Sequence, residues 1–231
     1  MRKFLLAALV GALALAVAGV ATAAINQGQE FNLDWTTKRP KANTGINVRF
    51  DNAGTKDPTG KPKAARKIVL RFPRGFKHDS SVRPTCSQAK LQAQGPAGCP
   101  SRSKIGSGEA EAVTGLPALD PVNVTLTQFN AKGALLTYIA PKPGEAGNPF
   151  VIKSTIRRNV ITIVPPKLAQ PTPYGEAILT KVTLKINAIR KGSDFLLTTP
   201  PCPSSRKWVV TGTWTYDAST TTVKDSSPCS R

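Results

Sequence analysis

Four cysteines are the residues of this chain whose type and spacing allow the most definite chemistry. Twelve residues separate Cys86 from Cys99, and 26 separate Cys202 from Cys229. The chain contains no Cys-x-x-Cys pair and a single histidine, His78, so it lacks the clustered ligands of a typical zinc site. An even number of cysteines in an exported protein indicates disulfides, and sequence proximity favours Cys86–Cys99 and Cys202–Cys229. A redox pair or a metal site is the less favoured alternative, and we predict no metal site.

Two carboxylates, Glu109 and Glu111, are the best candidates for acid–base catalysis. They lie in the sequence GSGEAEAVTG on one face of an expected strand, about 6 to 7 Å apart at the usual rise per residue. Glycoside hydrolysis commonly uses two carboxylates at a comparable separation. The competing interpretation is a solvated polar face opposite Ala110 and Ala112. His78 lies beside a lysine, and we expect a surface loop residue there rather than a member of a catalytic triad.

No other pattern in the sequence points to an active site. No Gly-x-Ser-x-Gly elbow is present, and no cluster of acids recurs at the spacing of a calcium loop. Enzyme activity therefore stays uncertain and is less favoured than a binding role. We predict no catalytic residue and no cofactor.

Positive charge is the strongest indication of a partner. The chain has 32 Lys and Arg against 13 Asp and Glu, a net charge of +19. A field of this size attracts polyanions, although it also serves solubility. Few aromatic residues interleave the basic ones and no nucleic-acid-binding motif is visible, so sequence-specific nucleic acid is not an expected partner. The residues predicted to bind an anionic cell-wall polymer, glycan or lipid headgroup are Arg49, Lys56, Lys61, Lys63, Lys67 and Arg71.

The first 23 residues have the pattern of a secretory signal peptide. Arg2 and Lys3 precede an apolar run from Phe4 to about Val20, and Ala-Thr-Ala at 21–23 fits the small-x-small rule for cleavage. An uncleaved membrane anchor is the alternative, because about 17 apolar residues approach the length of a spanning helix. We therefore predict a signal peptide at 1–23, a single secreted β domain at 24–231, and a location outside the cell or in its envelope.

Short apolar runs of period two dominate the rest of the chain. They are separated by turns rich in the 20 prolines and 18 glycines. This pattern predicts an all-β fold, an antiparallel β-sandwich of nine to eleven strands, with a β-barrel as the alternative. Residues 24–34 are expected to be a loose arm, although Phe31, Leu33 and Trp35 alternate. The expected strands include 46–51, 67–72, 104–113, 122–127, 134–140, 150–156, 160–164, 177–186, 208–216 and 220–223.

Three segments carry a resemblance to known sequences. PTCSQAKLQAQGPAGCPSRSKIGSGEA, PYGEAILTKVTLKI and TTPPCPSSRKW resemble parts of uncharacterised secreted proteins of high-GC actinobacteria. These proteins have no assigned activity, so the resemblance implies export and disulfides and assigns no catalytic residue. Together with the charge, it favours a non-catalytic secreted or envelope-associated protein. The alternative is a carboxylate-dependent enzyme that acts on polysaccharides.

Overall fold

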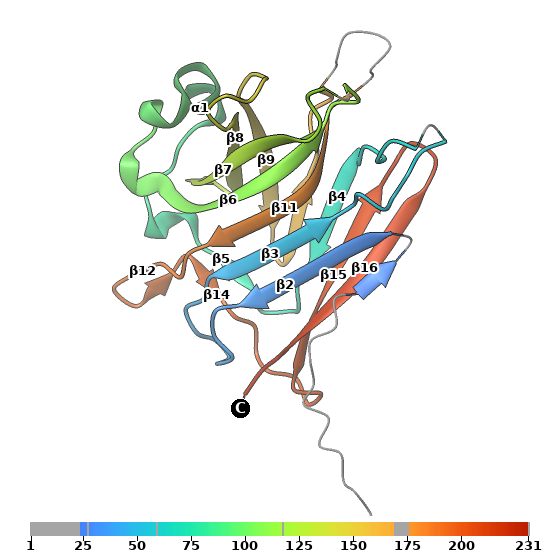
Figure 1. Ribbon diagram of the computed structural model, residues 1–231. Coiled ribbons are helices and arrows are strands. Elements are labelled where there is room, and N and C mark those ends of the chain that lie inside the picture. The colour runs from blue at the N-terminus through green and yellow to red at the C-terminus, as the bar shows by residue number, and fades with distance from the viewer. Residues whose placement is uncertain (1–23, 27, 59, 117, 169–175, 231) are drawn as a thin grey trace, which may run out of the picture.

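The computed structural model describes residues 24–26, 28–58, 60–116, 118–168 and 176–230. The expected signal peptide at 1–23 lies outside these residues. Strands are the main secondary structure of the described chain (Figure 1). The strands are β1 Ala24–Asn26, β2 Gln29–Trp35, β3 Ile46–Asp51, β4 Lys67–Arg71, β5 Lys77–His78, β6 Lys104–Val113, β7 Val122–Ala131, β8 Ala134–Pro141, β9 Phe150–Arg157, β10 Val160–Ile163, β11 Ile178–Ile186, β12 Arg190–Lys191, β13 Asp194–Phe195, β14 Leu197–Thr198, β15 Lys207–Thr215 and β16 Thr220–Pro228.

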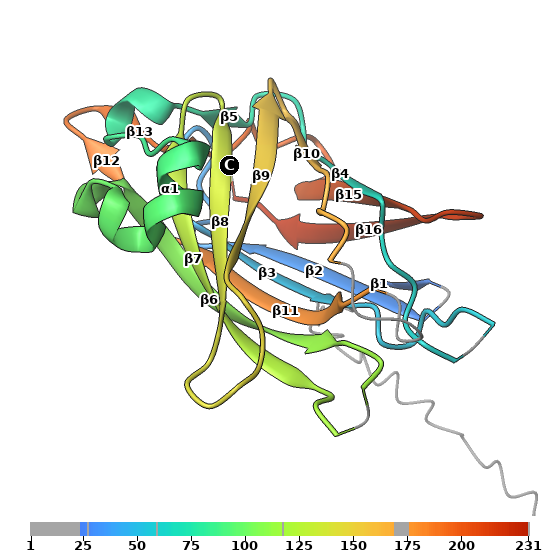
Figure 2. The same cartoon turned by 90° about the horizontal axis from the view of Figure 1, so that it is seen from above.

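Twelve of these strands form one antiparallel sheet that is nearly closed like a barrel. The strand order is β1-β2-β3-β11-β6-β7-β8-β9-β10-β4-β15-β16. Seen from above, β6, β11, β3 and β2 run along one side, and β8, β9, β10, β4, β15 and β16 along the other (Figure 2). The all-β antiparallel prediction is confirmed, and the curvature of the sheet follows the barrel alternative. Long-range pairings, such as β3 with β11 and β4 with β15, set this order.

The expected alternation of side chains decides which residues enter the barrel. In β4, Ile68 and Leu70 point inward, whereas Lys67 and Arg71 are exposed on the outside. Gly108 of β6 lies where a side chain would not fit, since a Cβ there would be 2.2 Å from the carbonyl oxygen of Thr183. Such close backbone approach is typical of a sharply curved part of a sheet.

The end strand β1 pairs only with the first three residues of β2, and side chains join the rest of β2 to β16 at the other end of the sheet. The backbone N–H of Leu33 donates to Oδ2 of the buried Asp225 at 2.7 Å, and the hydroxyl of Ser227 donates to the carbonyl of Leu33 at 2.9 Å. Tyr216 donates to the side-chain oxygen of Gln29 at 2.8 Å, and burial raises the pKa of Tyr216 to about 12. These contacts, which we call the seam, satisfy edge groups that would otherwise pair with another chain.

Most of the expected loose arm is instead strand β2 of the main sheet. β2 pairs with β3 over six residue pairs, and Phe31 and Leu33 are buried. The alternation of Phe31, Leu33 and Trp35 correctly indicates a strand. The polar residues between them do not argue against a strand, because they point outward. Among the described residues, no helix has the length and apolar character needed to cross a membrane.

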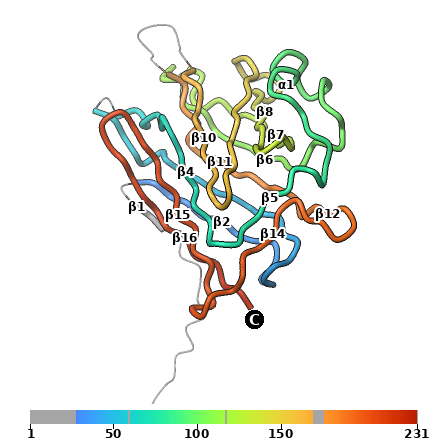
Figure 3. Tube along the Cα trace, turned by 180° about the vertical axis from the view of Figure 1, so that it is seen from behind, coloured from blue at the N-terminus to red at the C-terminus, as the bar shows by residue number. Residues whose placement is uncertain are grey.

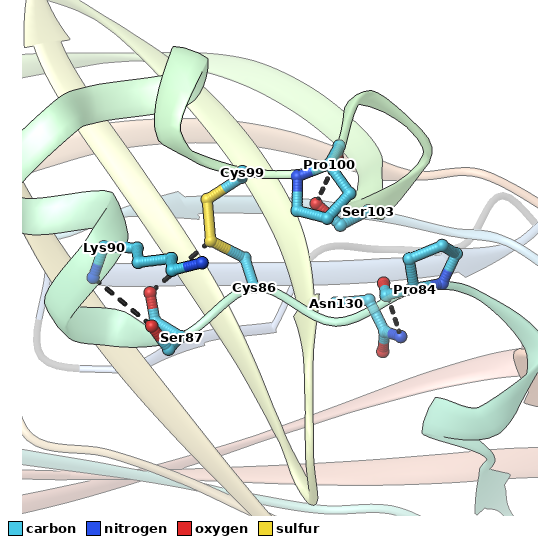
Figure 4. Close-up of a disulfide and its surroundings, with 8 residues drawn as sticks. All are labelled: Pro84, Cys86, Ser87, Lys90, Cys99, Pro100, Ser103 and Asn130. Carbon is cyan, nitrogen blue, oxygen red and sulfur yellow. Dashed lines mark hydrogen bonds between the residues drawn. A yellow bond between two sulfur atoms is a disulfide. The ribbon is translucent and has the colours of Figure 1, made fainter.

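A disulfide-bonded segment covers the outside of β7, β8 and β9. Helix α1 (Gln88–Gln94) begins after Ser87, whose hydroxyl accepts a hydrogen bond from the backbone N–H of Lys90 at 3.3 Å (Figure 4). Cys86 and Cys99 are joined, with Cα atoms 5.3 Å apart, and they pack against Phe129 and Leu136. The short 3-10 turns of this region are Ser80–Val82, Gly95–Gly98 and Ser101–Ser103.

Both predicted disulfides are confirmed. Cys202 and Cys229 are also joined, with Cα atoms 5.7 Å apart. This bond attaches the end of β16 to the segment between β14 and β15. It therefore holds one edge of the sheet beside the seam.

Candidate ligand cavity and charged outer faces

The interior of the barrel is not filled by its own side chains. A cavity of about 200 Å³ lies among strands from both sides of the sheet. Several of its apolar side chains are only half buried, which means that they face open space rather than packed neighbours. These half-buried lining residues are Val48, Phe50, Ile68, Phe150, Ile163, Leu179, Val182 and Leu184.

Loop residues border the cavity at one end, which we call the mouth. They are Ala64, Ala65, Arg66, Pro165, Pro166, Leu168, Glu176 and Ala177. Apolar residues and prolines make up most of this border. A ligand that enters here would pass apolar surface before it reached the strands.

Ion pairs of Arg66 join different sides of the mouth. Its guanidinium pairs with Glu176, just before β11, and forms two hydrogen bonds of 2.7 Å to Asp217 in the turn between β15 and β16. The hydrogen bond from Arg66 lowers the pKa of Asp217, and the two carboxylates raise the pKa of Arg66. The charge of Arg66 is therefore balanced at the mouth.

Polar side chains form one small group on the cavity wall. Gln128 of β7 donates from Nε2 to Oγ1 of Thr137 of β8 at 2.6 Å. Ser154 of β9 lines the same cavity. In the β8–β9 ladder it faces Leu135 and lies diagonally from Thr137, whose direct partner is Ile152. We call Gln128, Thr137 and Ser154 the polar trio.

The six residues predicted to form one basic face do not lie together. Arg49 lies on β3, between Asn32 and Thr183 of the neighbouring strands, in a shallow depression that it shares with Glu30 and Asp51. Its surroundings therefore hold both signs of charge, with Lys181 beside the carboxylates.

Lys56, Lys61 and Lys63 lie on the connection between β3 and β4, at the mouth end of the barrel. Lys56 is exposed and Lys63 is half buried. Nζ of Lys61 donates to the carbonyl oxygens of Thr114 at 3.1 Å and Glu176 at 2.6 Å. Lys61 therefore fastens two loops together, which is a structural role.

Lys67 and Arg71 belong to a different and more uniform surface. β9, β10, β4, β15 and β16 are consecutive in the sheet and follow one another in the view from behind (Figure 3). None of the outward positions in these five strands is Asp or Glu. Their six exposed cations, which we call the cationic face, are Lys67, Arg71, Lys153, Arg157, Lys207 and Lys224.

Strand register places three of these cations in one row. Arg157 pairs with Val160, Val160 with Arg71, Arg71 with Thr211, and Thr211 with Lys224. Neighbouring strands lie about 4.8 Å apart, so successive cations along the row are separated by about 10 Å. None of the six takes part in an ion pair formed by the described residues.

The opposite side of the barrel carries both signs of charge. We call the outward positions of β2, β3, β11 and β6 the mixed face. On it, Lys181 pairs with Glu111 at 3.0 Å and stands across from Asp51. Its charged residues are Glu30, Asp34, Arg49, Asp51, Glu109, Glu111, Lys181 and Lys185.

The candidate catalytic carboxylates lie on this mixed face. Glu109 and Glu111 share the outer side of β6, as the sequence predicts, while Ala110 and Ala112 are buried on the inner side. Glu109 pairs with Lys142 at 3.0 Å, and Glu111 with Lys181. Both acids therefore lie outside the cavity, in contact with lysines.

His78 is not the surface loop residue that the sequence suggests. It lies half buried in β5, opposite Leu197 of β14, and burial lowers the pKa of its imidazole. Within the described part of the chain, no group of three His, Cys, Asp or Glu side chains is placed to hold a metal ion.

Comparison of this chain with protein-family models, with curated proteins and with solved structures finds no match. The site must therefore be judged from its own geometry. The cavity is the feature of this site that the sequence does not predict. The sequence does contain many apolar positions that alternate and so point inward. This alternation does not reveal whether the sheet curves round on itself and leaves its interior unfilled.

Proposed function

We propose that this protein is a non-catalytic binding protein that holds an apolar ligand inside its barrel. The observation that carries the proposal is the cavity of about 200 Å³ lined by half-buried apolar side chains. Ligand sites are typically concave and apolar, with a few polar groups that orient the ligand. An engineered apolar cavity of about 150 Å³ already binds benzene. A ring system or part of an alkyl chain fits this space.

An unfilled apolar interior costs free energy. Apolar side chains without neighbours forgo dispersion contacts, and those that touch water forgo about 25 cal/mol for every Å² left exposed. A ligand that covers Val182, Leu184 and Phe150 recovers part of this free energy. Binding is therefore expected to raise the unfolding temperature.

The test uses the neutral fluorophore N-phenyl-1-naphthylamine, whose emission rises in apolar surroundings. The wild-type protein should bind it at micromolar concentration. Val182→Arg, which places a charge inside the cavity, should weaken binding at least tenfold. Thr183→Arg is the matched control because it adds the same side chain on the outer side of the same strand.

Three outcomes decide the proposal. Strong binding that Val182→Arg abolishes and Thr183→Arg preserves supports it. A wild-type protein that binds no fluorophore refutes it, as does equal binding by both variants. Circular dichroism and thermal unfolding of Val182→Arg show whether the variant is folded, and Leu184→Trp, which fills the same space without a charge, is the substitute if it is not.

The cationic face favours a second function, binding to an anionic polymer of the cell envelope. The supporting observation is the row of Arg157, Arg71 and Lys224, on strands with no outward acid. The set differs from the one predicted by sequence. It keeps Lys67 and Arg71 and replaces the other four with residues from β9, β15 and β16.

Dextran sulfate and uncharged dextran of equal length test this second function at about 50 mM salt. The double variant Arg71→Glu with Lys224→Glu should bind dextran sulfate several-fold more weakly than the wild type. Arg49→Glu with Lys185→Glu on the mixed face changes the net charge equally and should have little effect. An equal loss of dextran sulfate binding in both variants would show that net charge, and not the cationic face, causes the binding. Parallel measurements with anionic vesicles would separate lipid binding from polymer binding.

Export from the cytoplasm is part of the proposal. Two disulfides and no free cysteine among the described residues are compatible with an oxidising compartment outside the cell. N-terminal sequencing of protein from the culture medium tests it, and a mature chain that begins at Ala24 is the expected result. The polysaccharide-active enzyme remains a hypothesis that no feature of Glu109 or Glu111 favours further.

A further inference from the structure

The polar trio is the one place where strand side chains put hydrogen-bonding groups on an otherwise apolar wall of β7, β8 and β9. Thr137 and Ser154 lie in the middle of their strands rather than at the mouth. The neighbouring lining residues on these strands are apolar, including Leu126, Leu135 and Ile152. A polar group among such residues costs free energy unless it is hydrogen-bonded.

The hydrogen bond inside the trio leaves specific groups for a ligand. Thr137 accepts from Gln128, so its own hydroxyl hydrogen is free to point elsewhere. The carbonyl oxygen of Gln128 is a second acceptor, and the hydroxyl of Ser154 can donate or accept. The trio can therefore serve both the hydrogen and the oxygen of a hydroxyl group, or the oxygen of a ketone or ester.

The charges of the residues that line the cavity favour a neutral ligand over an anionic one. Among the described residues that line the cavity, the only cation is Arg66, and it is engaged by Glu176 and Asp217 at the mouth. No cation accompanies the trio on the wall. A carboxylate placed there would lose its hydration without gaining an opposite charge, which is strongly unfavourable.

We propose that the polar trio recognises a neutral oxygen-bearing group, a hydroxyl or carbonyl, on the apolar ligand of the cavity. This inference rests on the proposed function, because it assigns the chemistry of the ligand that the cavity binds. The trio fixes the depth and direction of the ligand, and the apolar wall supplies the affinity. A ligand that lacks the oxygen keeps the Gln128–Thr137 hydrogen bond but offers no partner to the remaining hydrogen-bonding groups of the trio.

The experiment measures displacement of N-phenyl-1-naphthylamine by n-octane, octan-1-ol, octan-2-one and octanoate at pH 8. Octan-1-ol and octan-2-one should displace the fluorophore at concentrations at least tenfold lower than octane or octanoate. Gln128→Leu should remove this preference while the fluorophore still binds. Thr137→Val is the second variant and should reduce the preference for octan-1-ol more than that for octan-2-one, because it removes a donor and an acceptor together.

Thr125→Val is the matched control, since it makes the same exchange as Thr137→Val on the outer side of β7. It should leave the preference unchanged. If the wild type binds the fluorophore but prefers none of the oxygen-bearing ligands, the role of the trio is refuted and the cavity function stands. If the fluorophore does not bind at all, the proposed function itself fails.

Discussion

The mixed face and the cationic face are opposite outer sides of one barrel, and they handle charge in different ways. On the mixed face, Lys181 lies between Glu111 and Asp51, so charges of opposite sign are cross-strand neighbours. On the cationic face, Arg71 has Val160 and Thr211 as its neighbours. Both faces cover the same apolar interior, so the core does not require this difference.

A net charge says little about a binding surface until the strand order is known. Arg49 and Arg71 both alternate with apolar residues in a strand, and the sequence treats them alike. The sheet places Arg49 in a depression that holds three carboxylates and Lys181, and it places Arg71 among threonines and valines. Only the second arrangement leaves a field that extends into solvent, because opposite charges at short distance cancel each other.

The largest expected effect comes from releasing an edge of the cationic face. Replacing Cys202 and Cys229 by Ala opens a 27-residue connection and should lower the free energy of unfolding by about 3 kcal/mol. Denaturant unfolding measures the change, and amide hydrogen exchange should rise first in β16. Replacing Cys86 and Cys99 is the comparison: it should raise exchange around α1 and leave β16 protected.

The second effect concerns the seam where the two faces meet. Asp225→Ala leaves the buried N–H of Leu33 without its acceptor, which should cost about 1–3 kcal/mol of stability. Asp225→Asn keeps an acceptor oxygen and should cost less. Asp34→Ala removes an exposed acid from the same strand as Leu33 and should change stability by less than about 0.5 kcal/mol. A loss in Asp34→Ala equal to that in Asp225→Ala would contradict the seam.

A smaller effect separates the two faces directly. Lys181→Met removes the partner of Glu111 and leaves acids side by side on the mixed face, so the melting temperature should fall slightly. Lys224→Met removes one of several like charges on the cationic face, and the melting temperature should stay or rise slightly. Differential scanning calorimetry at low salt measures both. A decrease of the same size in both variants would erase the distinction.

The smallest effect is the response to acid at the end of the cationic face. The hydrogen bond from Arg66 lowers the pKa of Asp217 in the folded state, so this carboxylate stabilises the fold above its unfolded pKa of about 4. That contribution is lost as the pH falls below about 4. Wild-type protein should therefore lose slightly more stability than Asp217→Asn between pH 5 and pH 3, measured by urea unfolding at each pH.

Much of the fold could be predicted because its signals are local. Ile46, Val48 and Phe50 mark a strand by period two, and the structure places that strand at Ile46–Asp51. The disulfides followed from spacing, since loops of this length close readily. The prediction of a loose arm at 24–34 is wrong because only Phe31, Leu33 and Trp35 show the alternation of a strand there. Their partners on β3 and β16 are remote in sequence.

The candidate site could not be predicted in the same way. Gln128, Thr137 and Ser154 are ordinary polar residues in three separate strands. Strand parity puts each on the same side as apolar residues such as Leu126, Leu135 and Ile152, but it does not show that the three lie near one another. They form a group because β7, β8 and β9 are neighbours and all three turn these positions inward. The six residues predicted to bind an anionic partner do not share one face, for the related reason that β3 and β4 are not adjacent in the sheet.

The all-β class, most of the strands, both disulfides and the excess of positive charge follow from the sequence alone. Each of these depends on residues close together in the chain or on composition alone. The tertiary structure decided that the sheet nearly closes, that its interior holds a cavity, and which cations share a face. Those features depend on strand order and register, which are fixed by pairing between distant segments and by the packing of the whole sheet.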